Sequence, residues 1–367
     1  MSGKVINIRL YLENGLSFGG SAFGYFRGEE LTGELTVNTG LTGYQEIITD
    51  PASAGKILCM TTPLIGSYGL NLDDMQAEKP HLKALVVRHK SDYPSNWRCE
   101  MSLDGYLKQN RILGIEEIDP RALTRIARDA GPLKVLISAN QNLTESQVQQ
   151  KLSSIPKENL VEKVTTKQKH VIDGKKDGKE LHIAVLDLGL KASVRASLQK
   201  RGARLTVFPA FTSSEDILGT QPDGIFLTSG PGSPDDIEGV VSTVAGLVEK
   251  KPVVGIGLGH LVLAKALGCG VTRMKFGHFG GNYPVKSVAC GSAYITSQGH
   301  DYVVSVCPAD VLPSYININD QSIEGIRHKT LHAASVAWAP EGNPGPNTDF
   351  VFDDFLKIIE EGRAHHA

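Results

Sequence analysis

The residues with the most chemical content lie in the segment Val253-Val254-Gly255-Ile256-Gly257-Leu258-Gly259-His260, where an apolar run enters a turn of regularly spaced glycines. A G-x-nucleophile-x-G turn between a strand and a helix lifts a Ser or Cys side chain into an active site. The central position of this turn is Gly257, which has no side chain. We therefore expect no covalent catalysis from this turn.

The same turn allows two other interpretations. In a dinucleotide-binding G-x-G-x-x-G turn the third glycine or alanine would fall at His260, and no acidic residue ends a following strand at the expected distance. We therefore predict no nucleotide and no other cofactor. The second interpretation is that the glycines only allow a strand and a helix to pack closely, and the turn alone does not exclude it.

The cysteines and histidines outside the turn predict neither a metal site nor a substitute nucleophile. The five cysteines are odd in number and form no C-x-x-C pair, so we expect free thiols, most of them buried, at Cys59, Cys99, Cys269, Cys290 and Cys307. Cys269, Cys290 and Cys307 in particular are predicted to be core thiols. The spacing of His260, His278 and His300 is not that of metal ligands, so no metal site is predicted.

The elements that must position the turn alternate between strand and helix patterns in the second half of the chain. Strand signals lie at 182–189, 204–208, 223–227 and 252–256, and helix signals at 191–201, 240–249 and 261–267. This alternation predicts an open, mostly parallel sheet with helices on both faces. The glycine-rich turns 228–234 and 255–259 both fall at the carboxyl ends of strands, where such sheets carry their sites.

The first half of the chain shows a different pattern, so the 367 residues predict two domains. Short strand signals lie at 5–12, 34–38, 56–61 and 82–88, and a helix is expected from Pro120, capped by Asp119 and stopped by Gly131. Residues 165–179 are polar and rich in lysine, which is more typical of a linker than of a nucleic-acid site. We expect domains at 1–164 and 181–367, joined by a linker at 165–180.

Composition limits the partners. The chain is 41% hydrophobic and 21% charged, with a net charge of −2, which gives no general attraction to nucleic acid or anionic membranes. Charged residues interrupt the N-terminal apolar positions too early for a signal peptide, and no apolar run is long enough to cross a bilayer. We expect a cytoplasmic protein with neither a membrane nor a nucleic acid as partner.

Several longer motifs give the chain a family resemblance that covers nearly all residues. They are 38–46 (NTGLTGYQE), 49–51 (TDP), 63–69 (PLIGSYG), 118–124 (IDPRALT), 229–232 (SGPG), 274–285 (MKFGHFGGNYPV) and 344–346 (PGP). The second half resembles class I glutamine amidotransferase domains. The whole chain resembles the small chains of carbamoyl-phosphate synthase.

The resemblance implies an α/β fold, with an N-terminal small-chain domain of mixed strands and helices before a class I amidotransferase-like open sheet. It also implies a Cys-His-Glu glutaminase that passes ammonia to a large synthetase chain. That chain makes carbamoyl phosphate, a precursor in pyrimidine and arginine biosynthesis. A thiolate, a histidine and oxyanion-holding amides would perform this chemistry.

Carried over by position, the resemblance places the thiol at Gly257 and the histidine at Ala339, so that only the carboxylate, Glu341, remains. We expect Glu341 to be structural. The family's side-chain contacts to glutamine would fall at Gly40, Leu261, Gly299, Asp301 and Tyr302, and only the aromatic character of Tyr302 survives. The parts supplied by the backbone, at Gly230, Gly232 and Leu258, do not depend on side chains and are expected to persist.

Three hypotheses follow. The first is a small-chain homologue with an inactive glutaminase that docks on a large, ammonia-using synthetase chain through its first domain and the run 275–284, although this run also fits a purely packing role. The second is a binding or regulatory protein that holds another small ligand in the altered glutamine pocket. The third, a glutaminase active by a different route, is the least favoured, because loss of triad members removes several powers of ten in rate.

Overall fold

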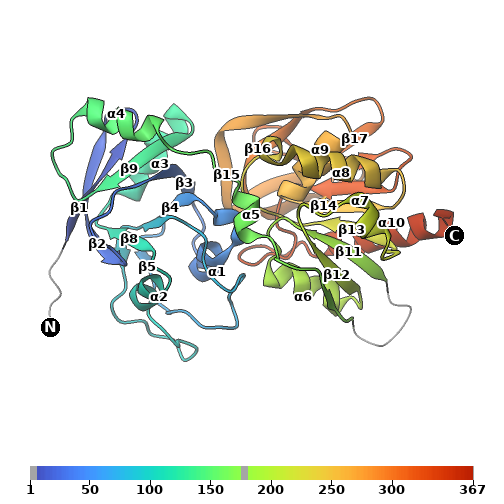
Figure 1. Cartoon of the computed structure of the whole chain (residues 1–367), viewed down its shortest axis with the longest axis horizontal. Coiled ribbons are helices and arrows are strands. Elements are labelled where there is room, and N and C mark those ends of the chain that lie inside the picture. Colours follow the sequence, from blue (N-terminus) through green and yellow to red (C-terminus); the bar gives the residue numbers. More distant parts are fainter. Residues whose placement is uncertain (1–5, 175–180, 367) are drawn as a thin grey trace. The chain divides into compact units, whose positions relative to one another are not determined.

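The computed structural model describes residues 6–174 and 181–366, with side chains up to 363. The chain divides into two compact units, one ending at Glu158 and the other beginning at Asn159, and each is described by itself (Figure 1). None of the helices in these described ranges is long and apolar enough to cross a membrane.

Unit 1 is built around a closed barrel. Its strands follow the order β1-β2-β8-β6-β4-β3-β9, and β9 pairs with β1 to close the ring. The barrel strands are β1 (Asn7–Leu12), β2 (Ser17–Gly24), β3 (Leu31–Asn38), β4 (Lys56–Met60), β6 (Ala84–Val86), β8 (Leu113–Glu116) and β9 (Leu133–Ser138). Strands β5 (Leu64–Ile65) and β7 (His89–Lys90) form a separate parallel pair. The helical elements are α1 (Tyr44–Thr49), η1 (Pro51–Ser53), α2 (Leu103–Gln109), α3 (Pro120–Ala130) and α4 (Glu145–Ser153).

Helix α3 confirms the expected caps. The Asp119 carboxylate accepts hydrogen bonds from the backbone N–H groups of Arg121 and Ala122, which have no partner inside the helix. Pro120 takes the first helical position, where its missing N–H removes no bond. Gly131 ends the helix with φ of 90°, a conformation that favours glycine.

Unit 2 is built on a sheet of ten strands in the order β10-β12-β11-β13-β14-β19-β18-β16-β15-β17. The strands are β10 (His170–Ile172), β11 (His182–Asp187), β12 (Arg204–Pro209), β13 (Gly224–Leu227), β14 (Val253–Ile256), β15 (Gly270–Ser287), β16 (Ala293–Val306), β17 (Val311–Asn317), β18 (Ile323–His328) and β19 (Ala333–Val336). Strands β12, β11, β13, β14 and β19 are parallel to one another, so the α/β sheet expected from the sequence is confirmed.

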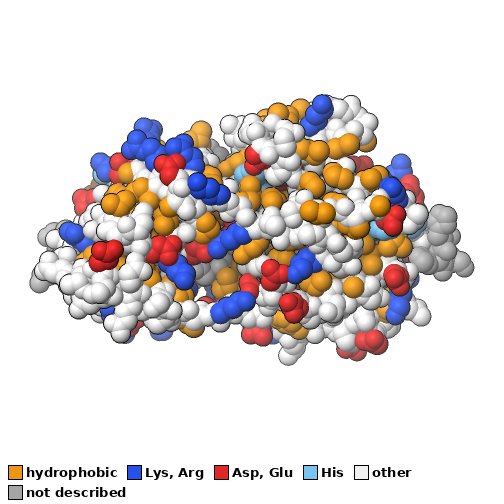
Figure 2. All heavy atoms as spheres, turned by 90° about the horizontal axis from the view of Figure 1, so that it is seen from above, with side chains coloured by type: hydrophobic (Ala, Val, Ile, Leu, Met, Phe, Trp, Pro, Cys, Tyr) orange, Lys and Arg blue, Asp and Glu red, His pale blue; other side chains and the backbone are white. Residues whose placement is uncertain are grey.

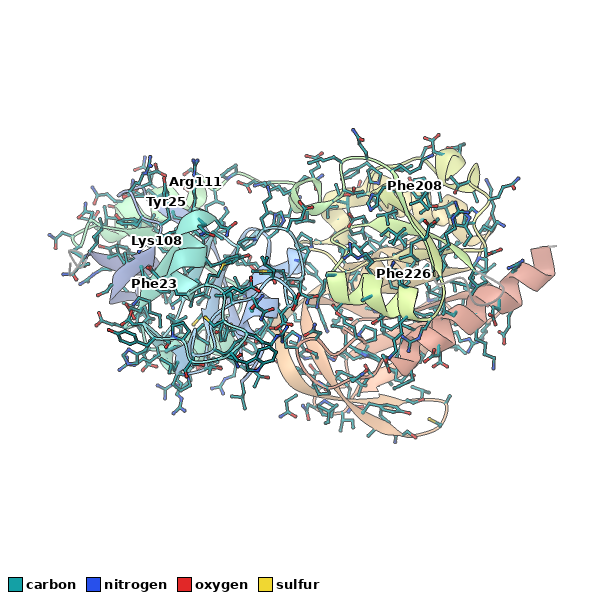
Figure 3. All side chains as sticks on the ribbon, turned by 90° about the horizontal axis from the view of Figure 1, so that it is seen from below. Phe23, Tyr25, Lys108, Arg111, Phe208 and Phe226 are labelled. Carbon is teal, nitrogen blue, oxygen red and sulfur yellow. The ribbon has the colours of Figure 1, made fainter. Side chains whose placement is uncertain are left out.

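Helical elements cover both faces of this parallel region. The core on one face includes side chains of α5 (Leu160–Val164), α7 (Ser214–Leu218), η2 (Pro234–Ile237), α8 (Glu238–Val248) and α9 (Leu258–Ala266). The core on the other includes side chains of α6 (Ala192–Lys200) and α10 (Phe350–His366). Phe208 belongs to the first core and Phe226 to the second; both are labelled in Figure 3. Phe226 stacks on Phe352 of α10 with 6.2 Å between ring centroids.

An antiparallel extension completes the sheet. Strands β15 and β16 form a long hairpin, and β17 and β18 pair with each other and with this hairpin. Strand β18 pairs antiparallel with β19 and so joins the extension to the parallel strands. No strand pattern in the sequence predicted this extension.

The expected linker differs from the structure in part. Residues 170–172, within the predicted linker, form β10, which pairs antiparallel with β12 at the edge of the sheet. Strand β10 has only three residues and is mostly exposed at the sheet edge, so it needs few apolar side chains. For this reason the sequence of the segment shows no strand pattern and looks polar. Residues 175–180 of the expected linker lie outside the described residues.

Acidic and basic side chains are interspersed on the face shown in Figure 2. This distribution agrees with the small net charge of the sequence. It gives that face no single sign of charge with which to attract a polyanion.

Candidate active site

The carboxyl ends of three neighbouring parallel strands bring the candidate site together. In β13 and β14, Leu227 pairs with Gly255, and in β14 and β19, Ile256 pairs with Val336. The backbone leaves the sheet after each of these three strands. The turns that begin at Thr228, Gly257 and Ala337 therefore lie next to one another. The Gly257 N–H donates to the Val336 carbonyl over 3.0 Å, which fixes the central turn against β19.

Gly257 holds the backbone of an elbow. It stands between β14 and α9 with φ of 54° and ψ of −118°, a backbone conformation that residues with a side chain rarely adopt. A Cβ atom on Gly257 would lie 2.4 Å from Ser229 Oγ and 2.9 Å from Ser229 Cβ. Ser229 therefore crowds the place where the side chain of a nucleophile at position 257 would begin, and it would have to shift to admit one.

We expect Gly257→Ala to destabilise unit 2 more than Gly268→Ala. Both glycines have positive φ, but a Cβ on Gly268 meets nothing within 4 Å. Backbone strain alone costs on the order of 1–3 kcal/mol, and overpacking adds about 1–3 kcal/mol. Thermal melting should show a fall for Gly257→Ala several degrees larger than that for Gly268→Ala, and Ser229→Gly should remove most of the difference. Equal falls for the two alanine variants would contradict the crowding by Ser229.

Ala339 stands where the resemblance implies the histidine. Its N–H donates to the Ser297 carbonyl over 2.9 Å, in an isolated antiparallel bridge with β16. Ser297 also donates from its hydroxyl to the Pro344 carbonyl over 2.6 Å, so β16 holds the loop after β19 at two points. The backbone around this position is thus well fixed, but its methyl side chain cannot accept a proton.

Glu341 is buried beside a lysine. Its carboxylate lies 2.8 Å from Lys191 Nζ, and the two side chains are 1% and 3% exposed. Lys191 stands at the start of α6, and its Nζ also donates to the Asn343 carbonyl over 3.1 Å. The charge of Glu341 is therefore balanced by a cation, and the carboxylate joins the loop after β19 to the β11–α6 connection.

Two glycines and a helix start stand at the positions where the resemblance implies the backbone parts of an oxyanion site. Gly230 allows its turn to approach the end of β11, since a Cβ there would lie 2.1 Å from the Leu188 carbonyl oxygen. Gly232 has φ of 87°. Leu258 is the first residue of α9, so its N–H is one of the helix's initial donors without an intrahelical acceptor.

The resemblance also implies side-chain contacts to glutamine at other positions of unit 2. The side chains present at these positions do not form a group of polar contacts for a substrate. Leu261 is 3% exposed and packs in the core, and a Cβ on Gly299 would meet open space. The carboxylate of Asp301 lies 3.1 Å from the guanidinium of Arg273, whose Cζ is 5.6 Å from the Tyr302 ring centroid.

Gly40 belongs to unit 1 and is described there. Its N–H donates to Asn38 Oδ1 over 2.8 Å. A Cβ on Gly40 would lie 3.0 Å from that same oxygen and 3.3 Å from Ile47 Cδ1. A larger residue at this position would therefore need a small movement of its neighbours.

His260 cannot replace the missing base. It is fully buried on α9, and its Nδ1 lies 2.8 Å from the Ser335 hydroxyl oxygen. Burial lowers the pKa of His260 to about 3, against the opposing effect of the Glu324 charge. The imidazole is therefore neutral near pH 7 and is held as part of the core.

Comparison with known proteins places this geometry in a family. Residues 10–137 match the family described as carbamoyl-phosphate synthase small chain, CPSase domain, and residues 184–358 match glutamine amidotransferase class-I. The carbamoyl phosphate synthase small chain of Clostridium perfringens is 43% identical over 351 residues, covering 95% of this chain and 98% of its own length. The chain belongs to the carbamoyl-phosphate synthase small chain family.

A second relative gives the same result. The carbamoyl phosphate synthase pyrimidine-specific small chain of Bacillus subtilis is 41% identical over 354 residues, covering 96% of each chain. Both family domains are thus present in one chain, in the order that the motifs of the sequence implied.

Within this small-chain family member, the expectations about the cysteines are wrong in part: only Cys59 and Cys269 of the five are buried, and Cys307, expected in the core, is half-buried. Cys269 is buried as expected, but Cys290 is exposed, because it lies in the turn between β15 and β16. Hydrogen bonds from Ser287 and Ser292 lower the pKa of Cys290 to about 7. The sequence contained no signal for this exposure, since the long hairpin itself was not predicted.

Two residues of the site, Ser229 and Lys191, were not predicted from the sequence. Ser229 was noted only as part of a glycine-rich turn, and Lys191 only as the start of a helix. Register could have revealed Ser229: two residues beyond Leu227, it must lie opposite Gly257, two residues beyond Gly255. No comparable signal identified Lys191 as the partner of Glu341.

Proposed function

We propose that this member of the family does not hydrolyse glutamine and acts by docking on a large synthetase chain that uses free ammonia. The observation that carries the proposal is at the elbow, where the nucleophile position is a glycine and the Ser229 side chain fills the space beside it. Ala339 at the base position supports it as well. A bound glutamine would meet neither a nucleophile nor a base from the positions that the family resemblance implies.

A stand-alone ligand-binding function has less support from the described residues. It relied on new side chains in the former glutamine pocket, chiefly Leu261 and Asp301. Leu261 is buried in the core, and Asp301 is paired with Arg273. Neither side chain is thus available as a new contact without rearrangement.

Unit 1 offers aromatic side chains that would suit docking. Tyr93 and Trp97 lie between β7 and α2, and are 89% and 91% exposed. Tyrosine and tryptophan are enriched at protein interfaces and often dominate their binding energy. We propose that these two residues anchor the large chain.

The run 275–284, also expected at the interface, has internal contacts. Tyr283 stacks on His278 with 4.6 Å between ring centroids, and its hydroxyl accepts a hydrogen bond from the Phe279 N–H. These contacts favour the packing role for this run. The domain ranges 1–164 and 181–367 and a cytoplasmic location stay predictions.

The docking proposal is tested by mixing the purified chain with the large synthetase chain of the same cell. We expect a complex on gel filtration and faster carbamoyl phosphate formation from added ammonia. Trp97→Ala should weaken binding about thirtyfold, the effect of a residue worth about 2 kcal/mol. Val306→Ala, which truncates an exposed apolar residue of unit 2, is the control and should change binding little.

Absence of both a complex and a rate increase would overturn the docking role. Copurification of the isolated chain with a small metabolite would then favour the ligand-binding alternative. Equal binding by Trp97→Ala and the unaltered chain would place the interface elsewhere.

A further inference from the structure

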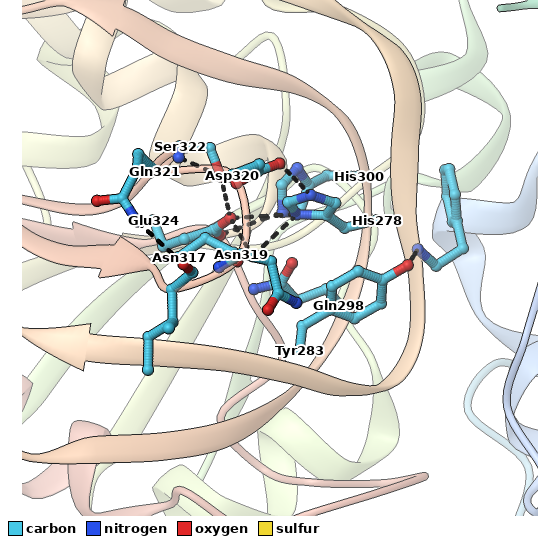
Figure 4. A network of polar contacts seen from close by, with 12 residues as sticks. His278, Tyr283, Gln298, His300, Asn317, Asn319, Asp320, Gln321, Ser322 and Glu324 are labelled. Carbon is cyan, nitrogen blue, oxygen red and sulfur yellow. Dashed lines mark hydrogen bonds and ion pairs between the residues drawn. The ribbon is translucent and has the colours of Figure 1, made fainter. Parts of the chain in front are cut away.

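A cluster of buried polar side chains in the antiparallel extension is not explained by the proposed function. His278 of β15, His300 of β16 and Glu324 of β18 offer ligand atoms that all lie within 4.8 Å of one another (Figure 4). The side chains of the two histidines are 8% and 7% exposed, and Glu324 is fully buried. No other group of three or more such side chains with metal-binding geometry occurs among the described residues.

The outer nitrogen of each histidine is already held by an acceptor. His278 Nε2 lies 2.8 Å from the Asp320 carboxylate, and His300 Nδ1 lies 3.0 Å from the Tyr302 carbonyl oxygen. An N–H on each outer nitrogen satisfies these contacts. In the neutral imidazoles the inner nitrogens, His278 Nδ1 and His300 Nε2, then carry lone pairs.

Both lone pairs face a carboxylate, which is itself only an acceptor. His278 Nδ1 lies 3.2 Å from Glu324 Oε1, and His300 Nε2 lies 3.3 Å from Glu324 Oε2. His300 Nε2 and Glu324 Oε2 are buried without a hydrogen-bond partner among the described residues. Glu324 Oε1 already accepts from the Ser322 hydroxyl over 2.9 Å, and the Asn317 amide nitrogen lies 3.5 Å from His278 Nδ1. A cation between the three side chains would give His300 Nε2 and Glu324 Oε2 the partner that they lack.

We propose that His278, His300 and Glu324 bind a divalent transition-metal ion of the Zn²⁺ type. Zn–N and Zn–O bonds near 2.1 Å place the ligand atoms of a tetrahedral site about 3.4 Å apart, and each histidine nitrogen lies at a similar distance, 3.2 or 3.3 Å, from one oxygen of Glu324. Asp320 and the Tyr302 carbonyl orient the two imidazoles as outer-shell acceptors do in zinc sites. The Asp320 side chain is 42% exposed, so the cluster reaches the protein surface at this residue.

The bound ion would tie three strands of the extension together. The charge also fits, because one divalent ion balances the carboxylates of Glu324 and Asp320. Two protons, one on each inner nitrogen, would balance the same charges without a metal. The experiment must therefore distinguish an ion from these protons.

The test uses the full chain with His365→Ala and His366→Ala as the background, because two successive histidines can bind metal ions by themselves. After dialysis against Zn²⁺ and removal of excess metal, we expect one zinc per chain by elemental analysis. Zn²⁺ should raise the melting temperature by about 5–10 °C at a hundredfold excess over Kd, and a chelator should reverse the rise. Mg²⁺, which prefers oxygen ligands, should have no such effect.

Glu324→Gln should weaken Zn²⁺ binding at least tenfold, and Asp320→Asn should weaken it about tenfold through the orientation of His278. His89→Gln, which alters an exposed histidine of unit 1, is the matched control and should bind Zn²⁺ normally. Much less than one zinc in the background chain would overturn the proposal and favour the protonated cluster. Stoichiometric zinc that all variants keep at equal affinity would overturn it too. The zinc content of the background chain tests the proposal even if a variant fails to fold.

Discussion

A chain that carries both Gly257→Cys and Ala339→His is expected to hydrolyse glutamine at least about a hundredfold more slowly than an active small chain of the family. The two substitutions return a thiol and an imidazole, but misplacement of a reacting group or substrate alone costs about a hundredfold. The introduced cysteine would also crowd the Ser229 side chain, since even a Cβ at position 257 would lie 2.4 Å from Ser229 Oγ. The rate of ammonia release from glutamine measures this effect.

Further substitutions should recover activity in steps. Ser229→Gly removes the crowding, and Gly299→Asn enters open space. Leu261→Gln returns a polar side chain but introduces it into a position that is now 3% exposed. A full rate from Gly257→Cys and Ala339→His alone would show that the side-chain contacts to glutamine are not needed.

The second large effect concerns the stability of unit 2. We expect Lys191→Met to lower the free energy of unfolding by about 3–5 kcal/mol, because it leaves the carboxylate of Glu341 buried without its cation. For a unit of this size the melting temperature should fall by roughly 10 °C. Thermal unfolding followed by circular dichroism measures the change.

The matched control is Lys357→Met, which removes the lysine of an exposed pair with Glu361 at 4.0 Å. This change should cost less than about 1 kcal/mol. A double variant, Lys191→Met with Glu341→Gln, should be more stable than Lys191→Met alone, because it leaves no buried charge. A Lys191→Met variant as stable as the control would contradict a structural role for Glu341.

The parallel half of unit 2 could be predicted from sequence because its strands are buried on both faces. Continuous apolar runs such as 252–256, followed by glycine turns and helical patterns, carry that signal directly. Helix α3 was predictable for a local reason, the Asp119 and Pro120 start and the Gly131 stop. Neither prediction needed knowledge of distant contacts.

The antiparallel extension was not predictable by the same means. Strands β15 and β16 are half-exposed, include many polar residues and pair with three register shifts, so they lack regular alternation. The cluster of His278, His300 and Glu324 depends on this pairing, and so does the exposure of Cys290. The spacing of the histidines in the sequence therefore predicted no metal site, although folding brings two of them to Glu324.

The site at the elbow was predictable in its positions but not in its contacts. Gly257, Ala339 and Glu341 follow from the resemblance, residue by residue. The crowding by Ser229 and the cation at Lys191 follow only from strand register and tertiary packing. These two contacts fill the space beside Gly257 and hold the loop that carries Glu341.

The inactivity of the glutaminase site is tested by measuring the ammonia that the unaltered chain releases from glutamine, with and without a large synthetase chain. An active small chain of the family serves as the positive control. We expect no release above background in either condition and no covalent glutamyl adduct by mass spectrometry, because neither Gly257 nor Ala339 can supply or activate a nucleophile. Ammonia release at the rate of the control chain would contradict this expectation.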